Sequence, residues 1–314
     1  MNSPRYFLAA ALAGTAAVTT ANAQDAGPLA LIVPASARSA SMGNAWVAGR
    51  DEYVIFHNPA LVSATPAFGV SVGSFSHGDG RSLSAASAVT VGPANLGWGV
   101  QVIDFSTPRA NTTYPFAPSA ITRRGDADIS SMVAVAAANI VFKGFRVGLA
   151  GKYAQDIAAR EASTSSLLVV PTRGWVALAD VGVSHPLWTG IAGLAVQNIA
   201  APYKMGTERV SVPSQVALGW TKVQVVGPFD VGYALQVTAR REGWISPAGG
   251  LDIGWSWIEG YSVSGRIGAR RTETDDERPV TAGATFNADR LNLEWGMGFF
   301  TENRMVHRLT VRWR

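Results

Sequence analysis

Two short stretches of the 314-residue sequence bring together residue types that could do chemistry. Ser76 and His77, with Asp79 close behind, are the types that a serine hydrolase uses as nucleophile, base and orienting carboxylate. The acidic run 275–277, beside two arginines, has the oxygen ligands that divalent cations prefer. Neighbours in sequence rarely meet as a catalytic triad, and both stretches fall in expected surface loops. We therefore predict neither an active site nor a metal site in them.

Other signatures of catalysis and of cofactor binding are missing from the sequence. The four histidines stand far apart without a His-Glu-x-x-His pair, and there is no phosphate-cradling loop. The absence of cysteine excludes disulfides, Cys-ligated zinc or iron–sulfur sites, thiol nucleophiles and a lipoprotein anchor. The sequence therefore predicts a protein that is not an enzyme and has no cofactor or metal. A hydrolase assembled from distant strands is the minor alternative.

The composition favours a membrane protein over a soluble enzyme. Only 15% of the residues are charged, well below the roughly 25% of an ordinary soluble domain, and the mean hydropathy is +0.14. The net charge of +4 is spread thinly along the chain. Because no long run of Lys and Arg gathers that charge, we expect no nucleic-acid partner.

The N-terminus has the features of an export signal. Residues 1–23 contain Arg5, an apolar stretch over 6–18 and the small residues Ala21 and Ala23 before Gln24, so they predict a cleaved signal peptide. No later apolar run approaches the ~20 residues of a spanning helix. An exported protein without cysteine fits a Gram-negative envelope. Only helices and closed barrels satisfy the backbone in lipid, which leaves the periplasm or an outer-membrane barrel.

Strand-like alternation runs through most of the remaining chain. Leu96, Trp98, Val100 and Val102 alternate with Gly, Asn and Gln, as in a strand with one apolar face. The same pattern predicts fourteen strands, over 67–77, 83–91, 94–105, 128–141, 143–154, 174–185, 190–198, 210–222, 228–238, 248–257, 261–271, 279–287, 290–300 and 305–314. Short links (92–93, 142–143, 186–189, 222–227, 258–260 and 288–289) alternate with mostly longer ones, above all 106–127 and 157–173. An even number of strands returns both termini to the periplasm.

The two faces of these strands differ as in a membrane barrel rather than in a soluble sandwich. The polar face is rich in Gly, Ala, Asn and Gln with scattered Arg, which suits a narrow lumen, and the apolar face carries Trp near strand ends. Candidate lumen-facing polar residues are Arg146, Lys152, Asp230, Gln236, Asp252, Arg266, Glu294 and Arg308, together with Arg270 and Arg312. They could define a polar pore. We favour the alternative that inward charges pair with one another and with a plug.

The segment before the first strand carries a family resemblance. It contains Arg38, Met42-Gly43-Asn44-Ala45, the acidic pair Asp51-Glu52 and Asn58-Pro59-Ala60, and it resembles the N-terminal motif of the PorV/PorQ family, relatives of the fatty-acid transporter FadL. Stretches 179–183, 191–199 and 212–220 look like that family's mid-barrel hairpin. The sequence departs from the pattern at Leu61 and Val62, where a Gly often follows, and in the position of the acidic pair.

The resemblance implies an N-terminal plug over 24–66 inside a fourteen-stranded barrel over 67–314. The plug motif would comprise Arg38, Met42, Gly43, Ala45, Asn58, Pro59 and Ala60, in a structural or a gating role. Asn58 can turn the chain before Pro59, which donates no hydrogen bond, and Gly43 permits close approach to the wall.

Two functions from different classes follow from the resemblance. PorV-type members imply a non-enzymatic accessory of type IX protein secretion that captures cargo proteins at the outer membrane. FadL-like members imply a transporter of hydrophobic small molecules. The expected partners are outer-membrane lipids with either secreted cargo and secretion machinery or a hydrophobic small molecule. We expect secretion first and transport as the alternative, because the inward faces are small and polar.

Overall fold

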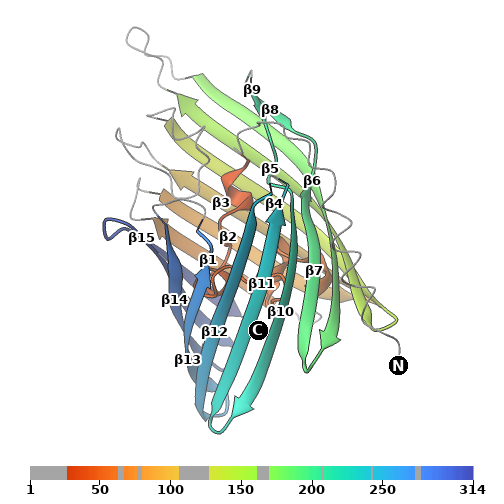
Figure 1. Ribbon diagram of the computed structural model, residues 1–314, viewed down its shortest axis with the longest axis vertical. Helices are drawn as coiled ribbons and strands as arrows, with labels where there is room; N and C mark the ends of the chain where they lie inside the picture. The colour runs from red at the N-terminus through yellow and green to blue at the C-terminus, as the bar shows by residue number, and fades with distance from the viewer. Residues whose placement is uncertain are drawn as a thin grey trace.

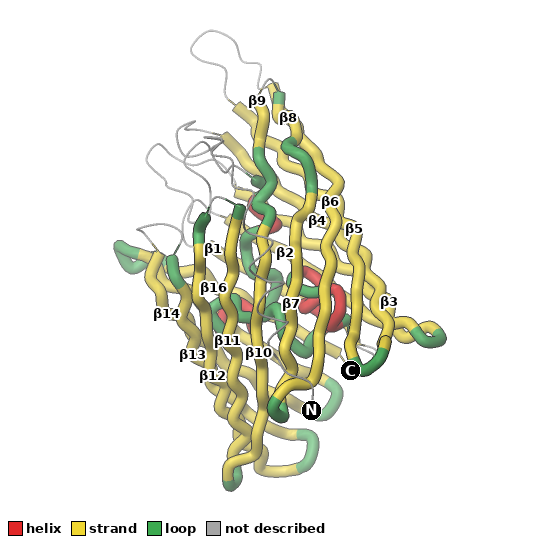
Figure 2. The backbone as a smooth tube through the Cα atoms, turned by 45° about the vertical axis from the view of Figure 1, so that its right-hand side comes forward, coloured by secondary structure: helices red, strands yellow, loops and turns green. Residues whose placement is uncertain are grey.

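A computed structural model describes residues 27–62, 67–75, 80–105, 127–160, 170–206, 208–241, 243–272 and 277–313. Within these ranges fourteen antiparallel strands close into a single barrel. Strands that neighbour one another around the wall are paired (Figure 1). The pairing of β1 with β16, which lie side by side in Figure 2, closes the wall. The predicted fourteen-stranded antiparallel barrel is therefore confirmed.

The barrel strands are β1 (Ala67–Phe75), β2 (Gly80–Val91), β3 (Ala94–Phe105), β4 (Ala127–Phe142), β5 (Phe145–Arg160), β6 (Val170–Leu187), β7 (Gly190–Ile199), β10 (Gln215–Val226), β11 (Phe229–Arg240), β12 (Ile245–Ile258), β13 (Tyr261–Arg270), β14 (Glu277–Ala288), β15 (Leu291–Phe300) and β16 (Met305–Trp313). A separate two-stranded sheet, β8 (Tyr203–Met205) with β9 (Glu208–Val210), interrupts the connection from β7 to β10.

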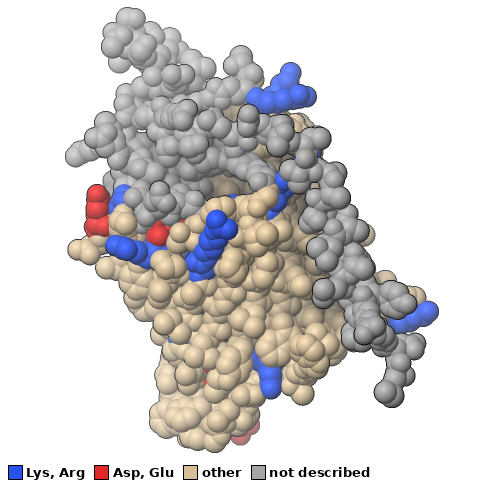
Figure 3. Space-filling view, in the orientation of Figure 1, with Lys and Arg blue, Asp and Glu red and all other residues tan. Residues whose placement is uncertain are grey.

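The outward face of the wall is apolar. On β5, Leu149 is 63% exposed whereas its neighbour Ala150 is buried, as expected for side chains that alternate between lipid and lumen. Most of the barrel surface drawn in Figure 3 is uncharged, and Lys and Arg lie mainly near one end. Among the described residues, no helix has the length and the hydropathy to cross a bilayer.

The short turns and the longer connections lie at opposite ends of the barrel. Two-residue turns such as Gly227-Pro228 join β10 to β11 at one end, and the connection containing β8 and β9 lies at the other (Figure 2). We call these the short-turn end and the long-loop end. This alternation agrees with the spacing that the sequence predicts. The connections 106–126 and 161–169 and the proposed signal peptide lie outside the described residues.

The structure corrects four of the predicted boundaries. The strand expected over 210–222 begins only at Gln215, because Pro213 has no N–H to give to a ladder. The link expected over 222–227 is largely strand, since β10 runs to Val226. Pro186, placed in a link, instead lies in β6 opposite Ile191. It is tolerated there because the pairing of β6 with β5 has already ended at Ser184. Strands β5 and β6 also extend further into the link expected over 157–173.

Residues 27–62, here called the inner segment, lie inside the barrel. The segment folds as η1 (Leu29–Leu31), α2 (Ala37–Ser41), η2 (Glu52–Phe56) and η3 (Pro59–Leu61), joined by turns. Its short helices lie within the ring of strands in Figure 2. Most of its residues are buried. The flanking residues 24–26 and 63–66 of the predicted plug lie outside the described residues.

Candidate functional site

The irregular backbone of the inner segment is satisfied by polar side chains of the wall. Thr310 of β16 accepts from Ala37 N at 2.8 Å, Gln236 of β11 accepts from Val47 N at 2.8 Å, and Thr221 of β10 donates to Ala48 O at 2.7 Å. Gln101 and Asn139 donate to further carbonyls of the segment. A buried backbone group left without a partner is costly. The polar inward face therefore fixes the inner segment in place, which is one reason why it is rich in Asn, Gln and Thr.

The Asn58-Pro59-Ala60 motif forms the turn that the sequence suggests. Asn58 is fully buried, its Oδ1 accepts from Ala60 N at 3.0 Å, and its Nδ2 donates to Val47 O at 2.9 Å. Pro59 occupies the first position of η3, where a missing N–H costs nothing. Asn58 thereby ties together two turns of the inner segment.

Gly43 lies at a close approach of the inner segment to the wall. Its φ is +65°, which favours glycine, and a Cβ there would lie 2.5 Å from Ala269 O of β13. On the wall side, a Cβ at Gly268 would lie 2.2 Å from Gly43 N. Both glycines are therefore required by contact between the two backbones. Met42 and Ala45 of the same motif are buried beside them.

The small residues of the wall leave room for the inner segment, and this gives a first test. A Cβ on Gly148 of β5 would lie 2.4 Å from Ala60 N, whereas one on Gly151 of the same strand meets no atom within 4 Å. We expect Gly148→Val to dislodge the inner segment while the barrel stays folded, and Gly151→Val to have no such effect. Limited proteolysis of the purified protein measures the displacement as the rate of cleavage within residues 27–62. Equal protection of the two variants would contradict the packing.

Several charged residues of the lumen form a network that spans wall and inner segment. Arg312 of β16 holds both carboxylate oxygens of Glu52, at 2.6 and 2.7 Å. Glu294 of β15, whose side chain is fully buried, lies 2.8 Å from Arg38 Nη2, 3.4 Å from Arg312 Nη1 and 3.6 Å from Arg266 Nη1. Arg266 also pairs with Asp252 at 3.3 Å. Buried charges of both signs thus offset one another.

The remaining members of the motif and of the predicted lumen set fall in different places. Arg308 donates to Ala35 O at 3.4 Å, and Gln236 holds Val47 as above. Arg146 is half-buried and Asp230 exposed, both near the short-turn end and away from the network. All eight predicted lumen residues share the inward parity of their strands, but only part of the set is brought together.

Asp51 is a further buried carboxylate in the segment. Its Oδ1 accepts from Trp46 Nε1 at 2.8 Å. Burial raises the pKa of Asp51 to about 6, although the nearby Arg312 opposes that shift. The two acidic residues of the motif therefore have different partners, because Glu52 binds Arg312 of the wall and Asp51 accepts a hydrogen bond from the indole of Trp46.

A second polar group lies around Lys152 of β5, towards the long-loop end. Lys152 Nζ lies 2.6 Å from Asp180 Oδ2 and donates to Asn198 Oδ1 at 3.1 Å and to Phe56 O at 3.3 Å. Burial, and secondarily the charge of Lys152, lower the pKa of His57 to about 3, so its imidazole is neutral. The inner segment is thus anchored to β5 and β6 as well as to β16.

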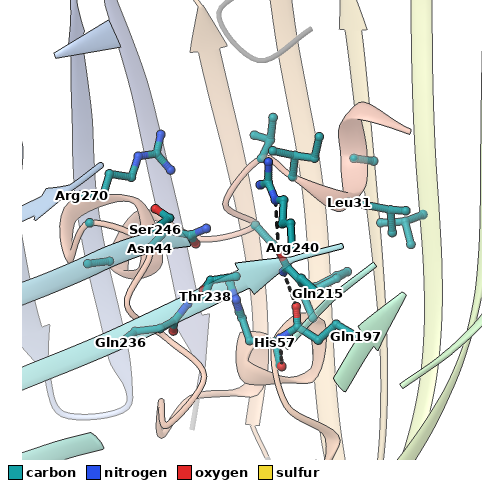
Figure 4. Close-up of a pocket in the computed structure, with 18 of the residues that line it drawn as sticks. Leu31, Asn44, His57, Gln197, Gln215, Gln236, Thr238, Arg240, Ser246 and Arg270 are labelled. Atoms are coloured by element: carbon teal, nitrogen blue, oxygen red, sulfur yellow. Dashed lines mark hydrogen bonds between the residues drawn. The ribbon is translucent and has the colours of Figure 1, made fainter. Parts of the chain in front are cut away.

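A hydrogen-bonded chain of side chains crosses from the inner segment to β11. Gln197 of β7 donates to His57 O, Gln215 of β10 donates to Gln197 Oε1 at 2.5 Å, and Arg240 of β11 donates to Gln215 Oε1 at 3.4 Å. Figure 4 draws these three contacts as dashed lines. The register places Gln215 opposite both Gln197 and Arg240, so the strands themselves align the chain.

These side chains border a cavity between the inner segment and the long-loop end, here called the chamber. The centre of a water molecule can occupy a volume of about 60 Å³ within it. The residues that line it are Ala30, Leu31, Ile32, Val33, Ala35, Gly43, Asn44, Phe56, His57, Gln101, Val133, Lys152, Gln197, Gln215, Gln236, Thr238, Arg240, Ser246, Ala248, Arg270 and Arg271.

Most of the chamber's polar residues could not be predicted from the sequence. Gln197, Gln215 and Arg240 lie at or near the long-loop ends of their strands. Gln197 and Gln215 fall in the stretches 191–199 and 212–220 of the family resemblance, which assigned them no role, and Arg240 falls in no motif. Their inward parity was the one available signal. The acidic run that might have bound a cation lies outside the described residues except for Glu277, which pairs with Arg270. The Ser76-His77-Asp79 stretch also lies outside them.

The comparisons with known proteins relate this fold to one class of barrel. No family model matches the sequence, and no curated protein matches it. Among solved structures, the toluene transporter TbuX of Ralstonia pickettii matches with a TM-score of 0.56 at 11% identity, over 93% of this chain and 99% of that one. A Pseudomonas aeruginosa FadL homologue matches with 0.59 at 9% identity, over 90% and 98%. The CymD monoaromatic hydrocarbon channel matches with 0.60 at 10% identity, over 94% and 98%.

The chain therefore has the fold of the FadL-like outer-membrane barrels. At 9–11% identity these likenesses show a shared barrel fold. The neighbours are transporters and channels rather than enzymes, which agrees with the prediction of a non-enzyme. No match supports the narrower resemblance to the PorV/PorQ family or the secretion role inferred from it.

Proposed function

We propose that this chain is an outer-membrane channel for small molecules that carry an apolar part, and that the inner segment is its plug. The observation that carries the proposal is the arrangement of a closed wall, an inserted segment and a chamber on the long-loop side of that segment. A molecule that enters from the long-loop end would reach the chamber first. It could go further only when the inner segment shifts.

The neighbours support a transport role rather than cargo capture. TbuX is described as a toluene transporter and CymD as a monoaromatic hydrocarbon channel. These likenesses favour the transport alternative of the sequence analysis. The network around Glu294 suits a plug with a definite resting position, because its ion pairs join the segment to β15 and β16.

Uptake measurements test the proposal. Gram-negative host cells without other channels of this kind would be given a radiolabelled monoaromatic compound, with and without this chain in their outer membrane. We expect the initial uptake rate to rise several-fold with the chain. The Gly151→Val variant, with equal amounts of folded barrel, should match the unmodified chain. Rates equal to those of cells without the chain would refute transport.

A further inference from the structure

The connection from β7 to β10 forms a hairpin at the long-loop end with one buried face. Its first strand, β8, lies against β6 (Figure 2). Tyr203 and Val210 face each other across the hairpin and are both 6% exposed, whereas Lys204 and Arg209 are exposed. The hairpin therefore packs against the barrel through its tyrosine and its valine.

The ring of Tyr203 lies in a niche of the barrel wall. A Cβ on Gly174 of β6 would lie 2.7 Å from Cε2 of that ring, so a side chain at this position would compete with the ring for space. The hydroxyl of Tyr203 donates to Oδ2 of Asp156 on β5 at 2.9 Å, and Asp156 is paired with Gly174 in the sheet. One strand pair thus supplies both the floor under the ring and the acceptor for its hydroxyl.

Neighbouring residues of the wall complete this niche, here called the cradle. The register of β4, β5 and β6 aligns its six inward-facing residues in two rows, Ser131 with Asp156 and Gly174, and Val133 with Ala154 and Val176. All six are buried. Every member belongs to the wall, and the hairpin contributes the ring that fills it. Tyr203 thus resembles a phenol tethered beside its own binding site.

Asp156 determines which molecules suit the cradle. Ser131 and Tyr203 are the hydrogen-bonding side chains beside its carboxylate, yet Oδ1 of Asp156 has no partner within the described part of the protein. The residue is only 4% exposed. A buried carboxylate with too few donors is costly, and when ionised it can only accept hydrogen bonds. The cradle therefore favours an aromatic ring that carries a hydrogen-bond donor over a plain hydrocarbon ring or an aromatic carboxylate.

The cradle shares part of its lining with the chamber. Val133 belongs to both, and Ala30, which lines the chamber, donates to Ser131 Oγ at 3.0 Å. The connection that carries the hairpin is tied to the wall at its base, where Asn198 Nδ2 donates to Pro213 O at 3.0 Å. Movement of the hairpin beyond this tie would uncover the cradle beside the chamber.

From these observations we propose that the cradle binds a monoaromatic molecule with a hydrogen-bond donor on its ring, a phenol in the simplest case, and that Tyr203 occupies the site until such a molecule replaces it. The ring would lie over Gly174 and its donor would bond to Asp156. This inference rests on the proposed function and narrows its substrate class. Because Tyr203 competes from the same chain, a free phenol binds more weakly than an empty cradle would allow.

Trypsin cleavage of the full chain in detergent tests the displacement of the hairpin. Lys204 and Arg209 are exposed trypsin sites within it. We expect phenol to speed cleavage at both sites several-fold, and toluene, which has a methyl group in place of the hydroxyl, to have little effect. Cleavage at the exposed Lys143, in the turn between β4 and β5, is the control for general loosening and should not change. Cleavage of the hairpin that phenol leaves unchanged, or that toluene speeds equally, would overturn the proposal.

Calorimetry on variants of the full chain places the binding site. Tyr203→Ala empties the cradle and should bind phenol about tenfold more tightly than the unmodified chain, because the internal competitor is gone. Adding Asp156→Leu should lower the ratio of phenol affinity to toluene affinity about tenfold, the effect of one hydrogen bond to a charged group. Adding Gly174→Val to Tyr203→Ala instead should abolish the binding of both probes.

A matched control and a fold check complete these measurements. Tyr233→Ala removes a tyrosine of β11 outside the cradle and should bind phenol as the unmodified chain does. Heat-dependent gel mobility checks that each barrel is folded. An unchanged ratio in the Asp156→Leu variant would overturn the proposal. Phenol binding by Tyr203→Ala, with none by the unmodified chain, would mark a cavity made by the substitution and would also overturn it.

Uptake assays separate this inference from the proposed function. Uptake of toluene and phenol by cells that carry the chain, without binding of phenol at the cradle, would retain the channel and refute the site. Binding of phenol at the cradle, without a gain in uptake of either compound, would retain the site and refute the channel.

Discussion

Replacing Glu294 with Gln should lower the free energy of unfolding by about 3–5 kcal/mol, the usual cost of removing one partner of a buried ion pair. The side chain is fully buried and lies near three guanidinium groups, from Arg38, Arg266 and Arg312. Gln keeps the shape but not the charge. The network would then hold one positive charge too many in a place that water reaches poorly.

Urea unfolding of the purified barrel, followed by tryptophan fluorescence and by gel mobility, measures this loss. Glu302→Gln is the matched control, because the Glu302 side chain is 81% exposed and its carboxylate lies as far as 3.8 Å from Nε of Arg304. Exposed pairs contribute little, so its unfolding midpoint should not change. Combining Glu294→Gln with Arg38→Gln should restore part of the loss by rebalancing the charge. An unchanged midpoint in Glu294→Gln would show that Glu294 does not hold the network together.

The barrel could be predicted from the sequence because its signal is local. Alternation with a period of two places each side chain on one face, and the strand expected over 94–105 is β3 at both ends. The same parity identified Lys152, Arg266 and Glu294 as inward-facing. Errors arose where a proline interrupted or failed to interrupt a strand, as at Pro213 and Pro186. There the outcome depends on which neighbouring strand needs the missing N–H, and that is not a local property.

The site could be predicted only in part because its contacts join distant residues. Arg312 and Glu52 are 260 positions apart, and no spacing rule links them. The sequence indicated that inward charges pair with one another and with a plug, but not which partners meet. The chamber was not predicted, because its glutamines and arginines come from different strands and no spacing in the sequence shows that they meet. The small polar inward face was taken to disfavour transport, whereas the structure shows that this face packs against the inner segment.

Tethering the inner segment to the wall should abolish uptake if the segment is the plug. The pair Met42→Cys and Gly250→Cys suits a reversible tether, because a Cβ on Gly250 would lie 2.9 Å from Cβ of Met42. A disulfide needs about 3.8 Å between its Cβ atoms, so a small shift of the segment accommodates it. The chain has no cysteine of its own, and the engineered pair is then the one disulfide that can form.

We expect the oxidised double variant to take up a monoaromatic compound no faster than cells without the chain, and a reducing agent to restore the rate. Met42→Cys alone should be insensitive to oxidation. A second control, Gly249→Cys with Ala269→Cys, joins residues that face each other on β12 and β13 and leaves the inner segment untethered. Loss of uptake in the first pair alone would show that passage requires the segment to move. Full uptake in the oxidised first pair would mean that molecules pass the segment at rest, and the plug would then be a fixed lining rather than a gate.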